Sequence, residues 1–140
     1  MPTPRRSNVL ADDTGAVEYL AVEDLVALAR MLLGDPPGIR DMGLLGSAAA
    51  RPETTAFGAD AYSELWTKTA ALLQSVVNNH ALVDGNKRLG WLACAVFLDI
   101  NGVDPIVAEN DDVFGLVMHV AAERIEIDDL ARRLQRILHV

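Results

Sequence analysis

Residues 86–102 read NKRLGWLACAVFLDING, and the part from Leu89 to Ile100 is apolar nearly all round. This apolar run, closed by Gly102 at a typical helix C-terminal position, predicts a helix from about Asn86 to Asn101. A helix without a polar face must be covered on all sides by other elements. We therefore expect it to be the central, buried helix of a bundle.

Apolar residues at helical spacing predict further helices on both sides of this one. Gly34 and Pro36 should stop the first helix, and Pro52 the second. Residues 51–59 are expected to be irregular or to form a small flap, and no alternation is long enough to predict a sheet. The fold class is therefore all-α. The expected helices cover about 23–33, 42–50 behind an Asp41 N-cap, 60–79 behind Asp60, 110–123 behind Asn110 or Asp111, and 128–139 behind Asp128.

Length and composition limit the kind of protein. The chain has 140 residues, which fits one domain, expected over 19–140 after a flexible tail over 1–18. A formal net charge of −8 argues against direct binding to nucleic acid. The single cysteine, Cys94, excludes a disulfide framework and a cysteine-based zinc site. No secretory signal is recognisable, and the longest apolar run is about half of a membrane span. We expect a cytoplasmic protein without membrane contact.

The stretch HALVDGNKR, residues 80–88, predicts an anion site before the apolar helix. The first turn of a helix exposes unpaired N–H groups and partial positive charge. Gly85 lacks the Cβ that would keep a ligand away from these groups. Lys87 and Arg88 oppose the helix dipole, a conflict that a bound polyanion removes. We therefore expect Gly85, Asn86, Lys87 and Arg88 to hold phosphates.

Two further side chains of this stretch suggest chemistry as well as binding. Asp84 would repel phosphate unless a divalent cation, magnesium above all, bridged the two. Asn86 can pin either the loop or a phosphate oxygen. His80 ends the preceding helix, and an imidazole there can take the proton of an attacking hydroxyl. Singly, each feature is common as a helix cap, a turn or a solvated pair, but together they favour phosphoryl transfer assisted by Mg²⁺.

The same residues resemble the core motif of the Fic/Doc family. HALVDGNKR, followed by an apolar helix ending in FLDINGV, is similar to the Doc (death-on-curing) toxin branch of that family. Most Fic proteins carry H-x-F-x-D/E-G-N-G-R-x-x-R and transfer AMP, whereas the Doc branch has a lysine at the position of Lys87. GIRDMGLLGSAAARPE, residues 38–53, is similar to the segment upstream in Doc proteins. The resemblance covers nearly the whole chain after Tyr19 and implies a compact Fic/Doc-type bundle.

The resemblance also implies roles and partners. His80 would be the general base, Asp84 the magnesium ligand, and Gly85 to Arg88 the holders of the ATP phosphates. Lysine at position 87 goes with an inverted nucleotide, so that the γ-phosphate faces the attacking hydroxyl. The implied protein is a toxin of a type II toxin–antitoxin system. It would phosphorylate a threonine of elongation factor Tu, halt translation, and be inhibited in trans by its cognate antitoxin.

Departures from the family pattern bear on this interpretation. Leu82 stands where phenylalanine is usual, and Asn78 where a basic residue is expected. Trp91 replaces the second arginine of AMP transferases, which agrees with the Doc branch. The inhibitory S/T-x-x-x-E-G/N motif is absent, because Arg51 stands four positions after Ser47, where the motif has glutamate. Inhibition should therefore come in trans. Two alternatives stay open: AMP transfer to a protein hydroxyl, and a catalytically silent nucleotide-binding interaction module.

Overall fold

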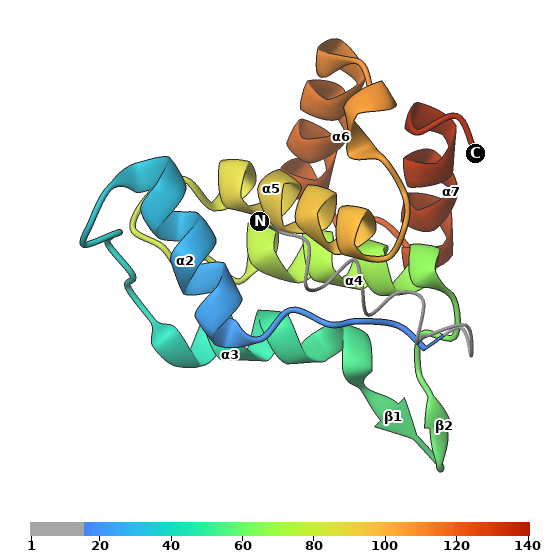
Figure 1. Ribbon diagram of the computed structural model, residues 1–140, viewed down its shortest axis with the longest axis horizontal. Helices are drawn as coiled ribbons and strands as arrows, with labels where there is room; N and C mark the ends of the chain where they lie inside the picture. The colour runs from blue at the N-terminus through green and yellow to red at the C-terminus, as the bar shows by residue number, and fades with distance from the viewer. Residues whose placement is uncertain (1–15) are drawn as a thin grey trace.

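The structure, a computed structural model, describes residues 16–140, and within them the fold is an assembly of short helices (Figure 1). A small antiparallel hairpin and two 3₁₀ turns are the other regular elements. This confirms the all-α prediction. The elements are α2 (Val22–Leu33), α3 (Met42–Ala50), η1 (Arg51–Glu53), β1 (Thr55–Ala56), β2 (Ala59–Asp60), α4 (Leu65–Asn78), α5 (Asn86–Ile100), η2 (Pro105–Val107), α6 (Asn110–Ala122) and α7 (Ile127–Ile137).

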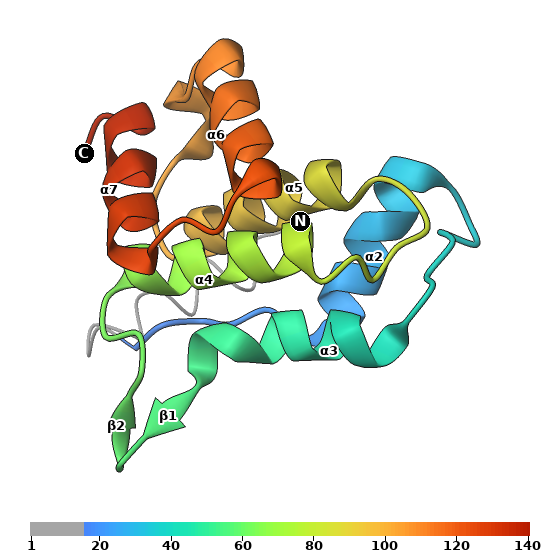
Figure 2. The ribbon, with the colours of Figure 1, turned by 180° about the vertical axis from the view of Figure 1, so that it is seen from behind.

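Helices α4 and α5 form the centre of the molecule. The ribbon shows α2 and α3 on one side of this pair and α6 and α7 on the other (Figures 1 and 2). One hydrophobic cluster joins α2 and α3 to the pair around Leu25, Leu45 and Phe97. A second joins α6 and α7 to it around Leu116 and Leu134. The central pair therefore contributes to two cores and links them.

The expectation that α5 is covered on all sides is confirmed, since no residue from Leu89 to Ile100 is fully exposed. Helix α4 is nevertheless the more buried of the two, with every residue from Lys68 to Val77 buried. The sequence gives little sign of this, because α4 carries several polar side chains. They tolerate burial because each is hydrogen-bonded: Lys68 bonds to Asp60 and to the Tyr62 carbonyl, and Gln74 to the Ile125 carbonyl.

The central helices approach each other closely at Gly90. A Cβ placed there would lie 2.6 Å from Cγ2 of Val77, so glycine is needed for α5 to pack against α4. This contact lies just after the first turn of α5 and close to the end of α4. It fixes the two helix ends between which residues 79–85 must form their loop.

Several predicted helix starts are wrong by a few residues. Asp60 is not the N-cap of α4: it lies in β2 and forms an ion pair with Lys68 at 3.2 Å, while Glu64 takes the N-cap position. Glu109 and Glu126, rather than Asn110, Asp111 or Asp128, precede α6 and α7. The aspartates lie instead in the first turns, where carboxylates favour the helix dipole. These aspartates indicate that a helix begins nearby, but they do not identify its N-cap residue.

The predicted N-terminal tail over 1–18 falls mostly outside the described residues, since the structure describes the chain from residue 16. The backbone of Glu18 exchanges two hydrogen bonds of 2.9 Å with the side-chain amide of Asn101, at the C-terminal end of α5. Val17 packs against the first hydrophobic cluster. In the part described, no helix is both long and apolar enough to cross a membrane.

Candidate active site

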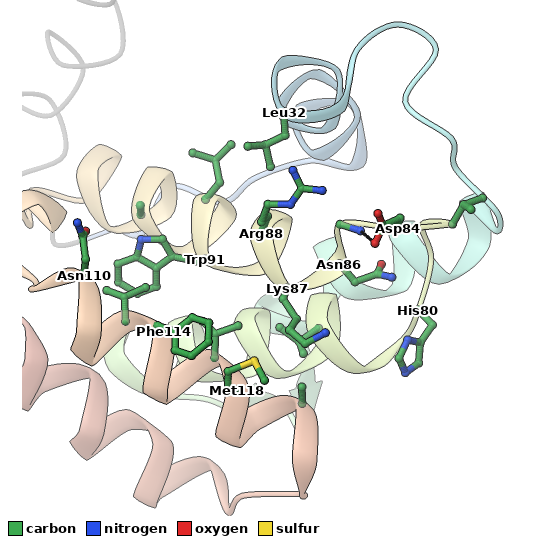
Figure 3. Close-up of a pocket in the computed structure, with 18 residues that line it drawn as sticks. Leu32, His80, Asp84, Asn86, Lys87, Arg88, Trp91, Asn110, Phe114 and Met118 are labelled. Carbon is green, nitrogen blue, oxygen red and sulfur yellow. Dashed lines mark hydrogen bonds between the residues drawn. The ribbon is translucent and has the colours of Figure 1, made fainter.

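A cavity of about 670 Å³ opens beside the first turns of α5, and all six predicted site residues line it (Figure 3). His80 comes from the end of the α4 segment, and the others from the loop and the start of α5. The structure thus brings together the whole predicted set: His80, Asp84, Gly85, Asn86, Lys87 and Arg88.

His80 has an unusual backbone conformation. Helix α4 ends at Asn78, Asn79 is its C-cap, and His80 follows with φ +53°. Left-handed backbone at this position normally calls for glycine, and a residue with a Cβ is less stable there. The guanidinium of Arg40 donates a hydrogen bond to the His80 carbonyl and so holds this turn. The conformation leaves the imidazole exposed at the cavity rather than packed along α4.

The segment before α3 supports the loop over residues 79–85. The Val83 amide donates to the Gly38 carbonyl at 2.9 Å, and the Arg40 amide to the Ala81 carbonyl at 2.8 Å. Asp41 caps α3 by accepting from the Leu44 amide at 3.0 Å, as predicted. Arg40 also bonds the His80 carbonyl through its side chain, so the segment contacts the loop at both ends.

Asn86 holds the loop from inside. Its side-chain oxygen accepts from the Leu82 amide at 3.0 Å, and its nitrogen donates to the Leu82 carbonyl at 3.1 Å. Of the two roles left open for this amide, the contacts are those of loop pinning. Leu82 itself is buried and anchors the loop in the first hydrophobic cluster, where the family usually has phenylalanine.

The structure gives two reasons for glycine at position 85 that the sequence did not show. Its φ is +90°, and a Cβ would lie 2.8 Å from Cδ2 of Leu33 in α2. Glycine therefore serves the left-handed turn into α5 and the packing against α2. The predicted role of Gly85 in the approach of a ligand stays a prediction.

The charged side chains of the site have few partners inside the protein. Lys87 and Arg88 are exposed, and within residues 16–140 neither makes an ion pair or a side-chain hydrogen bond. Asp84 accepts a hydrogen bond from the Gly85 amide at 2.9 Å through one carboxylate oxygen. Two cations that have no partner among residues 16–140, in a chain of net charge −8, leave a local site for an anion.

The site also fits a magnesium ion of the kind that substrate phosphates help to hold. Within the described chain, no group of three or more His, Cys, Asp or Glu side chains is arranged to bind a metal on its own. Asp84 is exposed and offers one carboxylate to the cavity that Lys87 and Arg88 also line. Mg²⁺ in phosphoryl-transfer sites is usually bound by one or two carboxylates together with phosphate oxygens and water.

The rest of the cavity was not predicted from the sequence. It is lined by Leu32 of α2, by Trp91, Leu92 and Ala95 of α5, and by one face of α6 that includes Asn110, Phe114 and Met118. The α6 residues recur at spacings of three and four, which is the available signal for a shared face. Trp91 lines this cavity and also packs against the second hydrophobic cluster.

Cys94 takes no part in the site. It is fully buried in α5, and burial raises the pKa of its thiol, which keeps it protonated and unreactive.

Comparison with known proteins agrees with the geometry. The family profile described as the Fic/DOC family matches residues 19–98, which include α2 to α4, the whole loop and all but the last two residues of α5. The chain is also 47% identical over 120 residues to the curated protein "Toxin Doc" of Mycolicibacterium smegmatis. That alignment covers 84% of this chain and 91% of the relative. On both grounds this chain belongs to the Fic/DOC family.

Proposed function

We propose that this chain is a toxin of the Doc type that transfers the γ-phosphoryl group of ATP to a Ser/Thr hydroxyl of elongation factor Tu. One observation supports the proposal: Lys87 and Arg88, which have no side-chain partner within residues 16–140, line the same cavity as Asp84 and His80. A base, a metal-binding carboxylate and cations for the phosphates are the groups that phosphoryl transfer requires.

In the proposed reaction, His80 accepts the proton of the target hydroxyl. The hydroxyl oxygen then forms a bond to the γ-phosphorus, and the bond from that phosphorus to the β–γ bridging oxygen breaks, releasing ADP. Lys87 and Arg88 bind the negatively charged phosphate oxygens and orient them. The magnesium ion held by Asp84 would neutralise phosphate charge when bound.

Two features favour phosphoryl transfer over AMP transfer. Lys87 fills the position where AMP transferases have glycine, and its side chain extends into the cavity between His80 and Met118 (Figure 3). Trp91 occupies the position of their second arginine, so a contact to phosphate is replaced by an aromatic surface. Both changes favour a terminal phosphate near His80.

The proposed partners are a protein substrate and an antitoxin. Similarity to a protein named Toxin Doc supports a toxin whose activity a cognate antitoxin inhibits in trans. Elongation factor Tu is proposed because the resemblance to the Doc branch implies it.

The test uses purified protein, Mg²⁺, a bacterial lysate and ATP labelled separately at the γ- and α-phosphate. Label from the γ-position should appear on a band of the size of elongation factor Tu, and purified factor should be labelled in the same way. The His80→Ala variant is the negative control. Label from the α-position would make the chain an AMP transferase. ATP binding without label on any band, purified factor included, would favour the silent binding module.

A further inference from the structure

The cavity extends well past the residues that phosphates need. Its polar end holds His80, Asp84 and Lys87, and Figure 3 shows Trp91, Phe114 and Asn110 toward the other end. A volume of about 670 Å³ lies within the range of sites for whole small molecules. The cavity therefore has room for more of a ligand than its phosphates.

The geometry of α5 places the two ends in line. Lys87, Trp91 and Ala95 are four residues apart on one helix face, so each lies about one turn, or 5.4 Å, beyond the last. Along α6, residues Asn110 and Phe114 belong to the facing wall. Ala95 keeps this end open because its side chain ends at Cβ.

The side chains at this end of the cavity are of the types that bind a nucleobase: two aromatic rings and an amide. Phe114 is an aromatic residue with 68% of its surface exposed, although it borders a cavity. Trp91 is half-buried and presents its indole to the same space. Within residues 16–140 the Asn110 side chain has no hydrogen-bond partner, so its amide is free to donate and to accept.

We propose that Trp91, Phe114 and Asn110 form the nucleobase subsite of this cavity, with an adenine ring stacked on the aromatic side chains. Flat aromatic surfaces bind bases by stacking. A side-chain amide pairs with the adenine N6 and N7 positions, donating to N7 and accepting from N6. This inference rests on the proposed function, since it assumes that the phosphates lie at Lys87 and Arg88.

The subsite also agrees with the direction of the nucleotide that the resemblance to the Doc branch implies. With the base at Trp91 and the phosphates along the first turn of α5, the phosphate farthest from the base lies toward His80. That is the γ-phosphate. The arrangement places the bond broken in phosphoryl transfer, rather than the α-phosphorus, beside the general base.

Fluorescence tests the subsite without depending on catalysis. The chain has two tryptophans, so a Trp66→Phe variant leaves Trp91 as the reporter. Mg·ATP should change the emission of Trp91 on binding. Inorganic triphosphate with Mg²⁺ should compete with ATP for the site and leave the emission unchanged, because it has no base to stack.

Two substitutions test the other residues of the proposed nucleobase subsite, Phe114 and Asn110. Phe114→Ala should raise the Kd of Mg·ATP by roughly tenfold through lost stacking, and leave the Kd of inorganic triphosphate unchanged. Phe57→Ala is the matched control, because Phe57 is exposed at the tip of the hairpin and does not line the cavity. Asn110→Ala should reduce the preference for ATP over GTP by roughly tenfold.

The outcomes separate this inference from the function on which it rests. If ATP binds and phosphorylates, but Trp91 emission is unchanged and Phe114→Ala binds ATP as tightly as the parent protein, the base lies elsewhere and the subsite is wrong. If neither ATP nor inorganic triphosphate binds, the proposed function is wrong as well. ATP binding with the expected emission change, followed by AMP transfer, would support the subsite and contradict the direction inferred from it.

Discussion

The cations beside the hairpin and the cations before α5 differ in how they are bound. Arg51 donates to the Tyr62 hydroxyl at 2.9 Å, to the Gln74 side chain at 2.8 Å and to the Ser75 hydroxyl at 3.0 Å. Lys87 and Arg88 have no side-chain partner within residues 16–140.

The difference separates a structural role from a ligand-binding one. Arg51 joins η1 to Tyr62, just after the hairpin, and to α4. Because its hydrogen bonds are made inside the protein, removing it should affect the fold. The cations of α5 lie at the end of the helix dipole that disfavours them, with little internal compensation. Their removal should leave the fold intact and affect only what binds there. The predictions below test this contrast, from the largest expected effect to the smallest.

His80→Ala should lower the rate of phosphoryl transfer by roughly 10³-fold, because general-base catalysis typically contributes 10²–10⁴-fold. The melting temperature should not fall, since the imidazole is exposed and alanine is smaller. Rates with purified substrate and thermal unfolding are the two measurements. His119→Ala is a matched control, because His119 bonds to Glu123 on α6 and does not line the cavity. A folded His80→Ala variant with full activity would remove His80 from the mechanism.

Arg51→Ala should destabilise the protein by about 2 kcal/mol, because it leaves the polar groups of Gln74, Ser75 and Tyr62 without their partner. The affinity for Mg·ATP should stay unchanged under native conditions. Urea unfolding and a calorimetric titration check the two halves of this prediction. A variant of normal stability would show that the Arg51 network does not support the fold.

Gly85→Ala should destabilise the protein by about 1–2 kcal/mol, because alanine is strained at φ +90°. The contact with Leu33 should add to this, so a Gly85→Ala, Leu33→Ala double variant should relieve the clash but not the backbone strain. Double-mutant analysis of urea unfolding measures the coupling between the two positions. Strict additivity would mean that the Cβ does not meet Leu33.

Lys87→Gly should lower phosphorylation several-fold, because one charge-assisted contact to phosphate is lost. The same change frees space in the cavity, so some label from α-labelled ATP is expected on the substrate. Parallel assays with γ- and α-labelled ATP give the ratio of the two transfers. Phosphorylation equal to that of the parent protein would contradict the role given to Lys87.

The sequence predicts much of this molecule where local signals decide the structure. The run from Leu89 to Ile100 is apolar enough to require a buried helix, and Asp41 is a strong N-cap. The six predicted site residues could be grouped from the sequence because they lie within nine positions of one another, and the structure places all six around one cavity.

Features that depend on distant segments were not predictable in this way. The hydrogen bond from Arg40 to the His80 carbonyl joins residues 40 positions apart. Part of the need for glycine at position 85 comes from the contact with Leu33 in α2. Asp60 bonds to Lys68, whose burial depends on how the hairpin folds back onto α4. The α6 wall of the cavity likewise exists only once α6 packs beside α5.

The central claim is that Lys87 and Arg88 have no partner within residues 16–140 because they hold a nucleotide's phosphates. A calorimetric titration with Mg·ATP, comparing the parent protein with the Lys87→Ala, Arg88→Ala double variant, tests it most directly. We predict that the parent protein binds and that the double variant binds at least roughly a hundredfold more weakly, at an unchanged melting temperature. Equal affinity in the two proteins would contradict the claim.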